Sequence, residues 1–307
     1  MGSNMIRRLE YSIKEKDMGK PIGKFLKEKG YSTTILTSLK KTTYGIQKNQ
    51  VHAFVNERLA VGDTLTICIE EQVEAEELIS LNCELDILYE DEDLLVVNKP
   101  YNMPIHPSIN NYHNTLANAV SNYYKKKNEA YVFRCINRLD RDTTGATIIA
   151  KNVLSASILS DQVKDRKIHR TYLALVEGET KEQGIIDLPI GRKEGSVIER
   201  MVDIKNGKRA VTHFHRVKTI KVKDKQVSLA KLKLETGRTH QIRVHMSYVG
   251  HPLLGDFLYN EECRLMKRQA LHSAELRFIH PISGREIKIL APLPEDMEGV
   301  LQEGSVR

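Results

Sequence analysis

An acidic run near residue 70 divides the chain into two parts of different pattern, and this division constrains the fold more than any other feature. Residues 70–77 have the sequence EEQVEAEE, which has no apolar period. Such a segment is typical of a linker, because it offers too little apolar surface to join a core. We therefore predict a small domain at residues 5–75, which includes part of this linker, and a large domain at residues 76–307. Residues 1–4 are typical of an expression scar and are left out of the fold prediction.

The small N-terminal part predicts two short helices followed by a strand pair. Apolar residues recur at helical spacing in two clusters, which are Ile22, Phe25 and Leu26, then Ile35, Leu36 and Leu39. Alternation over residues 51–55 and the β-rich residues 64–67 predict strands on either side of a turn. With Lys24, Lys40 and Lys41 on the helical part, this layout resembles the S4 type of RNA-binding module, which implies that these lysines contact RNA. The alternative is a small α/β domain whose basic face is simply solvated.

The larger part mixes strand and helix patterns, which predicts an α+β domain built around one large sheet. Residues 94–97 and 147–150 are apolar runs typical of buried strands. Between them, Leu116, Val120 and Tyr124 recur at helical spacing and predict a helix.

Composition narrows the class of protein. The chain has 47 Lys+Arg against 40 Asp+Glu, a formal net charge of +7 that favours anionic partners such as nucleic acid. Its four cysteines lie far apart, so neither a disulfide framework nor a zinc knuckle is expected. No run of 18 to 20 apolar residues is present, so no membrane segment is expected. We predict a cytoplasmic protein with reduced cysteines.

Residues 135–145, CINRLDRDTTG, form the most informative segment, a loop between a predicted strand and the buried strand at residue 147. Side chains alternate along an extended chain, so Arg138 and Asp140 would point the same way while Leu139 enters the core. A cation and a carboxylate would then share one surface. The alternative is a turn in which the aspartate caps a neighbouring helix.

This loop resembles the R-L-D-x-x-T-[ST]-G signature of the RluA-type pseudouridine synthases. Three further segments are similar to motifs of that family, at residues 89–107, 170–178 and 236–256. The resemblance implies the mixed, mostly antiparallel sheet of the pseudouridine synthase fold, with Asp140 as the catalytic residue. It also implies an isomerase that needs no cofactor, because uracil leaves C1′ of its ribose and rejoins through C5 without loss of atoms.

Other residues are predicted to support Asp140. A carboxylate in a pocket that excludes water needs a fixed cation, and Arg243 is the best candidate. It lies in a predicted helix that buries a stripe of Ile242, Met246 and Val249 and turns Arg243 elsewhere. Arg238, in the loop before that helix, is better placed for a phosphate, although the two arginines could exchange roles.

The resemblance implies roles for two more residues. Tyr172 lies in a predicted strand and would stack on the uracil or handle a proton, whereas core packing is its default role. Arg138 would occupy the space of the flipped nucleotide or hold its phosphate. The chain departs from the family pattern at Asn137, where histidine is usual, and at Asn102, where glycine is common. Asn102 tolerates positive φ well, so its effect should be small.

We predict no metal. His240 and His245 are five apart, a spacing that points their side chains in different directions on a helix, and His213 and His215 have no third ligand indicated. The expected partner is structured RNA, with ribosomal RNA first and transfer RNA second, bound by a monomer. Two other functions are compatible with parts of the sequence: a non-catalytic RNA-binding or ribosome-assembly protein, and a glycosidase or nucleosidase. The latter normally uses two cooperating carboxylates, and only Asp142 lies near Asp140 in the sequence, where it more plausibly braces the loop.

Overall fold

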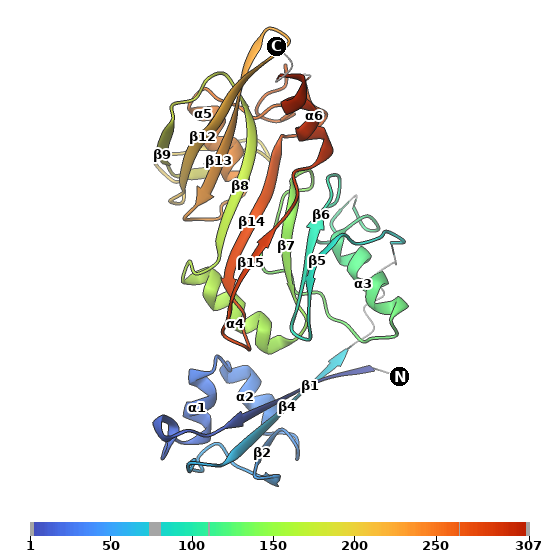
Figure 1. The fold of residues 1–307 in the computed structure, drawn as a ribbon, viewed down its shortest axis with the longest axis vertical. Helices are drawn as coiled ribbons and strands as arrows, with labels where there is room; N and C mark the ends of the chain where they lie inside the picture. Colours follow the sequence, from blue (N-terminus) through green and yellow to red (C-terminus); the bar gives the residue numbers. More distant parts are fainter. Residues whose placement is uncertain (1–2, 74–80, 110, 264, 305–307) are drawn as a thin grey trace.

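The computed structural model describes residues 3–73, 81–109, 111–263 and 265–304. A four-stranded N-terminal sheet, in the order β1-β4-β2-β3, lies at one end of the molecule (Figure 1). Its elements are β1 (Ser3–Ser12), the 3-10 helix η1 (Glu15–Asp17), α1 (Ile22–Glu28), α2 (Thr33–Leu39), β2 (Ile46–Lys48), β3 (Val51–His52) and β4 (Thr64–Val73). The two short predicted helices are present, and their six apolar residues are all buried.

One expectation for this part is wrong, and one segment excluded from the fold prediction belongs to the fold. Residues 70–73 of the acidic run form the end of β4 and not a linker, and residues 74–77 of the run lie outside the described residues. Ser3 and Asn4, left out as an expression scar, begin β1, where they pair with Val73 and Gln72. The reason is the same for both segments. Backbone hydrogen bonds between β1 and β4 hold them in place, and such long-range pairing leaves no periodic pattern of apolar residues in the sequence.

The rest of the described chain is built on a large sheet of nine strands, in the order β5-β6-β7-β14-β8-β13-β12-β9, with β15 paired to β14. Its strands are β5 (Ile87–Glu90), β6 (Leu94–Lys99), β7 (Thr144–Ala150), β8 (His169–Glu177), β9 (Gln183–Asp187), β12 (Val211–Val222), β13 (Lys225–Leu234), β14 (Leu271–Ile279) and β15 (Glu286–Leu290). The pair β7–β14 is parallel, and the other neighbours within it are antiparallel. The predicted α+β class with a mixed, mostly antiparallel sheet is confirmed.

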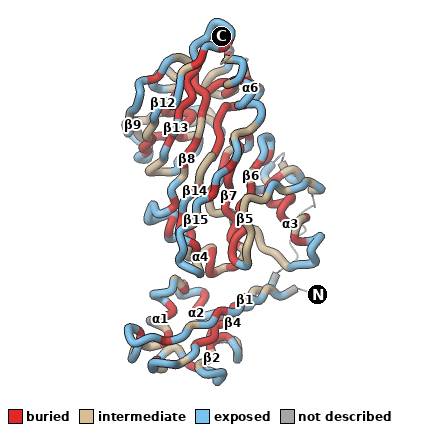
Figure 2. The backbone as a smooth tube through the Cα atoms, in the orientation of Figure 1, coloured by how far each residue is buried: buried red, intermediate tan, exposed pale blue. Residues whose placement is uncertain are grey.

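Helices and one small hairpin cover the large sheet. They are α3 (Leu116–Lys126), α4 (Val153–Lys164), α5 (Gln241–Tyr248), α6 (Glu295–Glu303) and the hairpin of β10 (Ile190–Arg192) and β11 (Arg200–Val202). The buried residues follow the central strands β7, β14 and β8 (Figure 2). In the described parts of the chain, no helix has both the length and the apolar character needed to cross a membrane.

α4 lies between the N-terminal sheet and the large sheet (Figure 1). Leu154 of α4 is part of the N-terminal core, and Glu71 of β4 accepts a hydrogen bond from the Val153 amide at 2.9 Å. The same carboxylate forms an ion pair with Arg134, and Arg7 of β1 donates two hydrogen bonds of 2.9 Å to Asp93. The two parts are therefore joined by charged side chains as well as by apolar packing.

Candidate active site

A cavity of about 850 Å³ opens beside the large sheet, between the ends of several elements. Its walls come from the loop after residue 135, from β8, from the end of β13 and from the loop that leads into α5. All five site residues predicted in the large domain line it: Arg138, Asp140, Tyr172, Arg238 and Arg243. Every described residue that lines this cavity comes from residues 105–271, so Lys24, Lys40 and Lys41 of the N-terminal part lie outside it.

Arg243 is the centre of the charged groups. Its Nη1 donates to Asp140 Oδ2 at 3.2 Å, while its Nε and Nη2 donate to the two oxygens of Asp256 at 2.7 and 2.8 Å. Burial alone would lower the pKa of Arg243, but Asp256 and Asp140 reverse this effect and hold the pKa above its usual value. The guanidinium therefore presents a fixed positive charge to Asp140, whose side chain is 27% exposed.

The fold of α5 explains this position, although one detail of the sequence prediction is wrong. Ile242 and Met246 are buried as predicted, but Val249 lies just past the helix and is 38% exposed. Arg243 is itself buried. A buried arginine is stable here because Asp256 satisfies it with two parallel hydrogen bonds, and the sequence analysis gave Asp256 no role.

Hydrogen bonds from the side chains of Asn137 and Lys99 hold the loop that carries Asp140 in place. The Asn137 side chain donates to the Ala146 carbonyl at 3.0 Å and accepts from the Ile148 amide at 2.7 Å, so it ties the loop to β7. Lys99 Nζ donates to the carbonyls of Arg141 and Met103, each at 2.9 Å. Asn137 therefore has a clear role in supporting the loop.

Two further predictions about the loop agree with the geometry. Leu139 packs into the core beside Tyr172, while Arg138 is exposed at the cavity. The Asp142 carboxylate accepts from the Arg141 side chain and from the Asn102 amide, and so braces the loop. Asn102 has φ +54°, the backbone region that favours glycine and tolerates asparagine.

Tyr172 is buried at the cavity wall. Its ring shares a core with Leu139 and Ile242. Burial raises the pKa of its hydroxyl, and Arg170 opposes part of this shift. The hydroxyl is therefore protonated at neutral pH.

His240 lies close to Asp140 and contacts Tyr259, an arrangement that the sequence did not indicate. His240 Nε2 lies 3.8 Å from Asp140 Oδ2, and its Nδ1 lies 2.9 Å from the Tyr259 hydroxyl. Burial lowers the pKa of His240, and Asp140 opposes this shift only in part. Because the Tyr259 hydroxyl already accepts from the Arg200 amide at 2.9 Å, its own proton favours His240 Nδ1. A neutral His240 would then turn its N–H towards Asp140.

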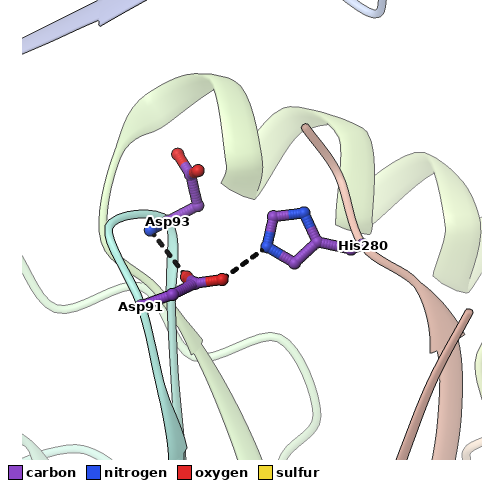
Figure 3. Close-up of side chains that lie close together, drawn as sticks. All are labelled: Asp91, Asp93 and His280. Atoms are coloured by element: carbon purple, nitrogen blue, oxygen red, sulfur yellow. Dashed lines mark hydrogen bonds and ion pairs between the residues drawn. The ribbon is translucent and has the colours of Figure 1, made fainter. Parts of the chain in front are cut away.

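One group of side chains in the described part of the chain has the spacing of metal ligands (Figure 3). It contains Asp91, Asp93 and His280, whose ligand atoms lie within 4.8 Å of one another. Asp91 accepts from His280 Nε2 at 2.7 Å and from the Asp93 amide at 2.8 Å. His280 Nδ1 accepts from the Ser283 amide at 3.0 Å, so the ring proton is on Nε2. These atoms are engaged in hydrogen bonds, and the group serves to fix the turn before β6.

The histidines considered as ligands in the sequence also have other partners. His245 is buried, with Nδ1 at 2.9 Å from Thr212 Oγ1 and Nε2 at 2.9 Å from the Leu188 carbonyl. His213 Nε2 lies 2.8 Å from Glu235 Oε1.

Comparison with known proteins identifies the family. The model of the RNA pseudouridylate synthase family matches residues 93–248, which include Asp140, Tyr172 and Arg243. An uncharacterized RNA pseudouridine synthase of Bacillus subtilis, YjbO, is 42% identical over 90% of this chain and 96% of its own length. The chain belongs to the RNA pseudouridine synthase family.

Two further relatives agree with this assignment. Ribosomal large subunit pseudouridine synthase D of Zymomonas mobilis is 42% identical over 70% of this chain and 71% of its own length. The solved structure of human RNA pseudouridylate synthase domain containing 1 superposes with a TM-score of 0.57 at 26% identity, over 73% of this chain and 96% of the human one. The resemblance to the RluA-type pseudouridine synthases is therefore confirmed, together with the pseudouridine synthase fold and the isomerase class.

Proposed function

We propose that this chain converts specific uridines of ribosomal RNA into pseudouridine, with Asp140 as the catalytic carboxylate and without a cofactor. The observation that carries the proposal is the geometry of Asp140, which lies in a large cavity 3.2 Å from an arginine that Asp256 holds in place. The choice of ribosomal RNA rests on the similarity to ribosomal large subunit pseudouridine synthase D of Zymomonas mobilis. Transfer RNA is the second choice.

The reaction breaks the bond from C1′ to N1 of uracil and forms a bond from C1′ to C5, after which C5 loses a proton and N1 carries one. The Asp140 carboxylate can add to the uracil ring or act at the sugar, and both routes need the same support. Arg243 stabilises the carboxylate charge through its fixed guanidinium. Tyr172, protonated and facing the cavity, stacks on the base or handles the proton.

The remaining residues would bind the RNA. Arg138 and Arg238 line the cavity, where they suit the flipped nucleotide and its phosphate. Residues 5–75 would be an S4-like RNA-binding domain that contributes Lys24, Lys40 and Lys41, and residues 76–307 would be the catalytic domain. All three lysines are exposed, as such a role requires. We further propose that the protein acts as a monomer in the cytoplasm.

The test is chemical mapping of pseudouridine in total RNA from cells that carry the intact gene, a deletion, Asp140→Asn or Asp224→Asn. Asp224 is a matched control, because its side chain is 97% exposed in a turn remote from Asp140. We expect one or more ribosomal sites to be lost in the deletion and with Asp140→Asn, and kept with Asp224→Asn. If only a site in transfer RNA changes, the substrate is transfer RNA and not ribosomal RNA. If the site is kept with Asp140→Asn, Asp140 is not the catalytic residue.

A further inference from the structure

The C-terminal end of α4 has an unusual residue at a position that normally takes glycine. The Lys167 amide donates to the Gln162 carbonyl at 2.8 Å, and the Arg166 amide donates to the Val163 carbonyl at 3.1 Å. These two bonds define a Schellman motif, whose left-handed position is usually glycine because a Cβ is disfavoured there. Here that residue is Arg166, with φ +57°. The chain therefore accepts backbone strain to place an arginine at this point, which is typical of functional positions.

Arg166 lies at the cavity. It lines the large cavity and also an adjoining recess of about 170 Å³, as do Arg170 and Glu235. Its Nη1 donates to Glu235 Oε2 at 3.4 Å across the gap between α4 and the end of β13. The Arg166 side chain is 56% exposed and that of Glu235 is 35% exposed, so solvent reaches this ion pair.

Two further side chains, Arg209 and His213, contact Glu235 at the same place. Arg209 Nη2 lies 3.7 Å from Glu235 Oε2, and His213 Nε2 lies 2.8 Å from Oε1. One carboxylate thus faces three side chains that all suit an oxyanion. Exposed ion pairs of this kind contribute little stability, so another anion can replace the carboxylate at small cost.

We propose that Arg166 binds a phosphate of the substrate RNA next to the target uridine, and that this phosphate takes the place of the Glu235 carboxylate. The inference rests on the proposed function. RNA carries a phosphate at every nucleotide, and a guanidinium binds two phosphate oxygens at once, which suits an arginine better than a lysine here. Glu235 then has two effects: it keeps Arg166 oriented in the free enzyme, and it repels RNA that cannot place a phosphate at this position.

The strained backbone makes a clean test possible, because Arg166→Gly removes the guanidinium and relieves the strain in one change. A residue with only a structural role would leave RNA binding unchanged. The matched control is Lys223→Gly, since Lys223 is also a basic residue with positive φ (+44°) and lies in the turn between β12 and β13, far along the hairpin from Glu235.

The measurement is pseudouridine formation in large-subunit ribosomal RNA transcribed in vitro, together with thermal unfolding. For Arg166→Gly we expect KM to rise about fivefold to tenfold, kcat to stay within about twofold, and the unfolding temperature to stay equal or rise. The slope of log affinity against log salt should fall by about one. For Lys223→Gly we expect the same change in unfolding temperature with an unchanged KM. For Glu235→Gln we expect KM to fall about threefold.

The outcomes separate this inference from the function on which it rests. If the wild-type enzyme forms no pseudouridine in ribosomal or transfer RNA transcripts, the proposed function fails. If the wild type is active and Arg166→Gly has the wild-type KM and salt slope, the role of Arg166 is wrong. A higher KM for Glu235→Gln would show that Glu235 assists RNA binding and does not compete with phosphate. That result would overturn the proposal that a phosphate replaces the Glu235 carboxylate.

Discussion

The arginine at the floor of the cavity and the arginine at its rim differ in burial and in how firmly their side chains are held. At the floor, which consists of Asp140, Arg243 and Asp256, the Arg243 side chain is 2% exposed and is fixed by three hydrogen bonds. At the rim, where Arg166 and Glu235 line the cavity, the Arg166 side chain is 56% exposed and makes one long ion pair. Chemistry needs a charge whose position is set before substrate arrives, whereas binding needs charges that can change partner. The predictions below break or sharpen this contrast.

Replacing Arg243 with methionine should have the largest effect. Asp256 is fully buried, so loss of its guanidinium partner leaves an uncompensated charge. We expect the free energy of unfolding to fall by about 3–5 kcal/mol, with no detectable pseudouridine formed. Urea denaturation measures the first effect. The matched change at the rim, Arg166→Met, should cost less than about 1 kcal/mol, and equal losses at both places would remove the contrast.

Asp256→Asn should show whether the orientation of Arg243, and not only its presence beside Asp140, matters for catalysis. Arg243 keeps its contact with Asp140 but loses the charged, bidentate support that orients it. We expect kcat to fall about 100-fold while KM stays within about threefold, as for a loss felt in the transition state. Steady-state kinetics on a ribosomal transcript measures this. A variant with raised KM and normal kcat would mean that Asp256 serves RNA binding and does not position Arg243.

Lys99, which supports the loop that carries Asp140, should make the stability of the protein depend on pH. Burial lowers its pKa to about 7, whereas the unfolded chain holds the proton until about pH 10.5. Between these values the unfolded state binds more protons, so the stability of the wild type should rise with pH, by up to about 1.4 kcal/mol per unit.

The measurement is the free energy of unfolding from pH 7 to 9 for the wild type and for Lys99→Met. The difference between the two should grow with pH. A constant difference would show instead that the Pro100, Met103 and Arg141 carbonyls, which accept from Lys99 Nζ at 2.8–2.9 Å, keep the ammonium charged.

The smallest effect is expected outside the cavity. Lys24, Lys40 and Lys41 are exposed in the N-terminal part, so their replacement by alanine should weaken RNA binding about tenfold and reduce its salt dependence. The value of kcat should stay unchanged. Filter binding at several salt concentrations checks this, with Lys221, Lys223 and Lys225 replaced as the matched set. Equal losses from both sets would mean that net charge, and not the N-terminal surface, determines affinity.

Much of the fold could be predicted because its signals are local. The helix through Leu116 and Tyr124 and the buried strand at residues 147–150 each show their period within a few turns or residues. β1 gave no such signal, because Arg7, Arg8 and Glu10 interrupt its apolar positions and because it depends on pairing with β4, about sixty residues later. The acidic run was misassigned for the same reason, since Glu71 is stabilised by Arg134 and by the start of α4.

The candidate site shows the same limit. Sequence reasoning, helped by the family resemblance, named five residues that line one cavity. It gave no role to Asp256, Tyr259 or His240, because their value arises only when α5 and the segment after it fold against the Asp140 loop. Asp256 follows a glycine with φ +67°, where a Cβ would lie 2.2 Å from the Arg268 carbonyl oxygen. The need for glycine at this position arises from the folded structure and could not be predicted from the sequence.

The length of α4 sets the distance between the N-terminal part and Arg166. Its first residue accepts support from Glu71 of the N-terminal sheet, and Arg166 follows directly after its last turn. A helix of 12 residues is a stiff rod about 18 Å long. If the N-terminal part and Arg166 both bind RNA as proposed above, α4 holds these two contacts at a constant separation. Lengthening α4 by one turn should then shift which uridine enters the cavity.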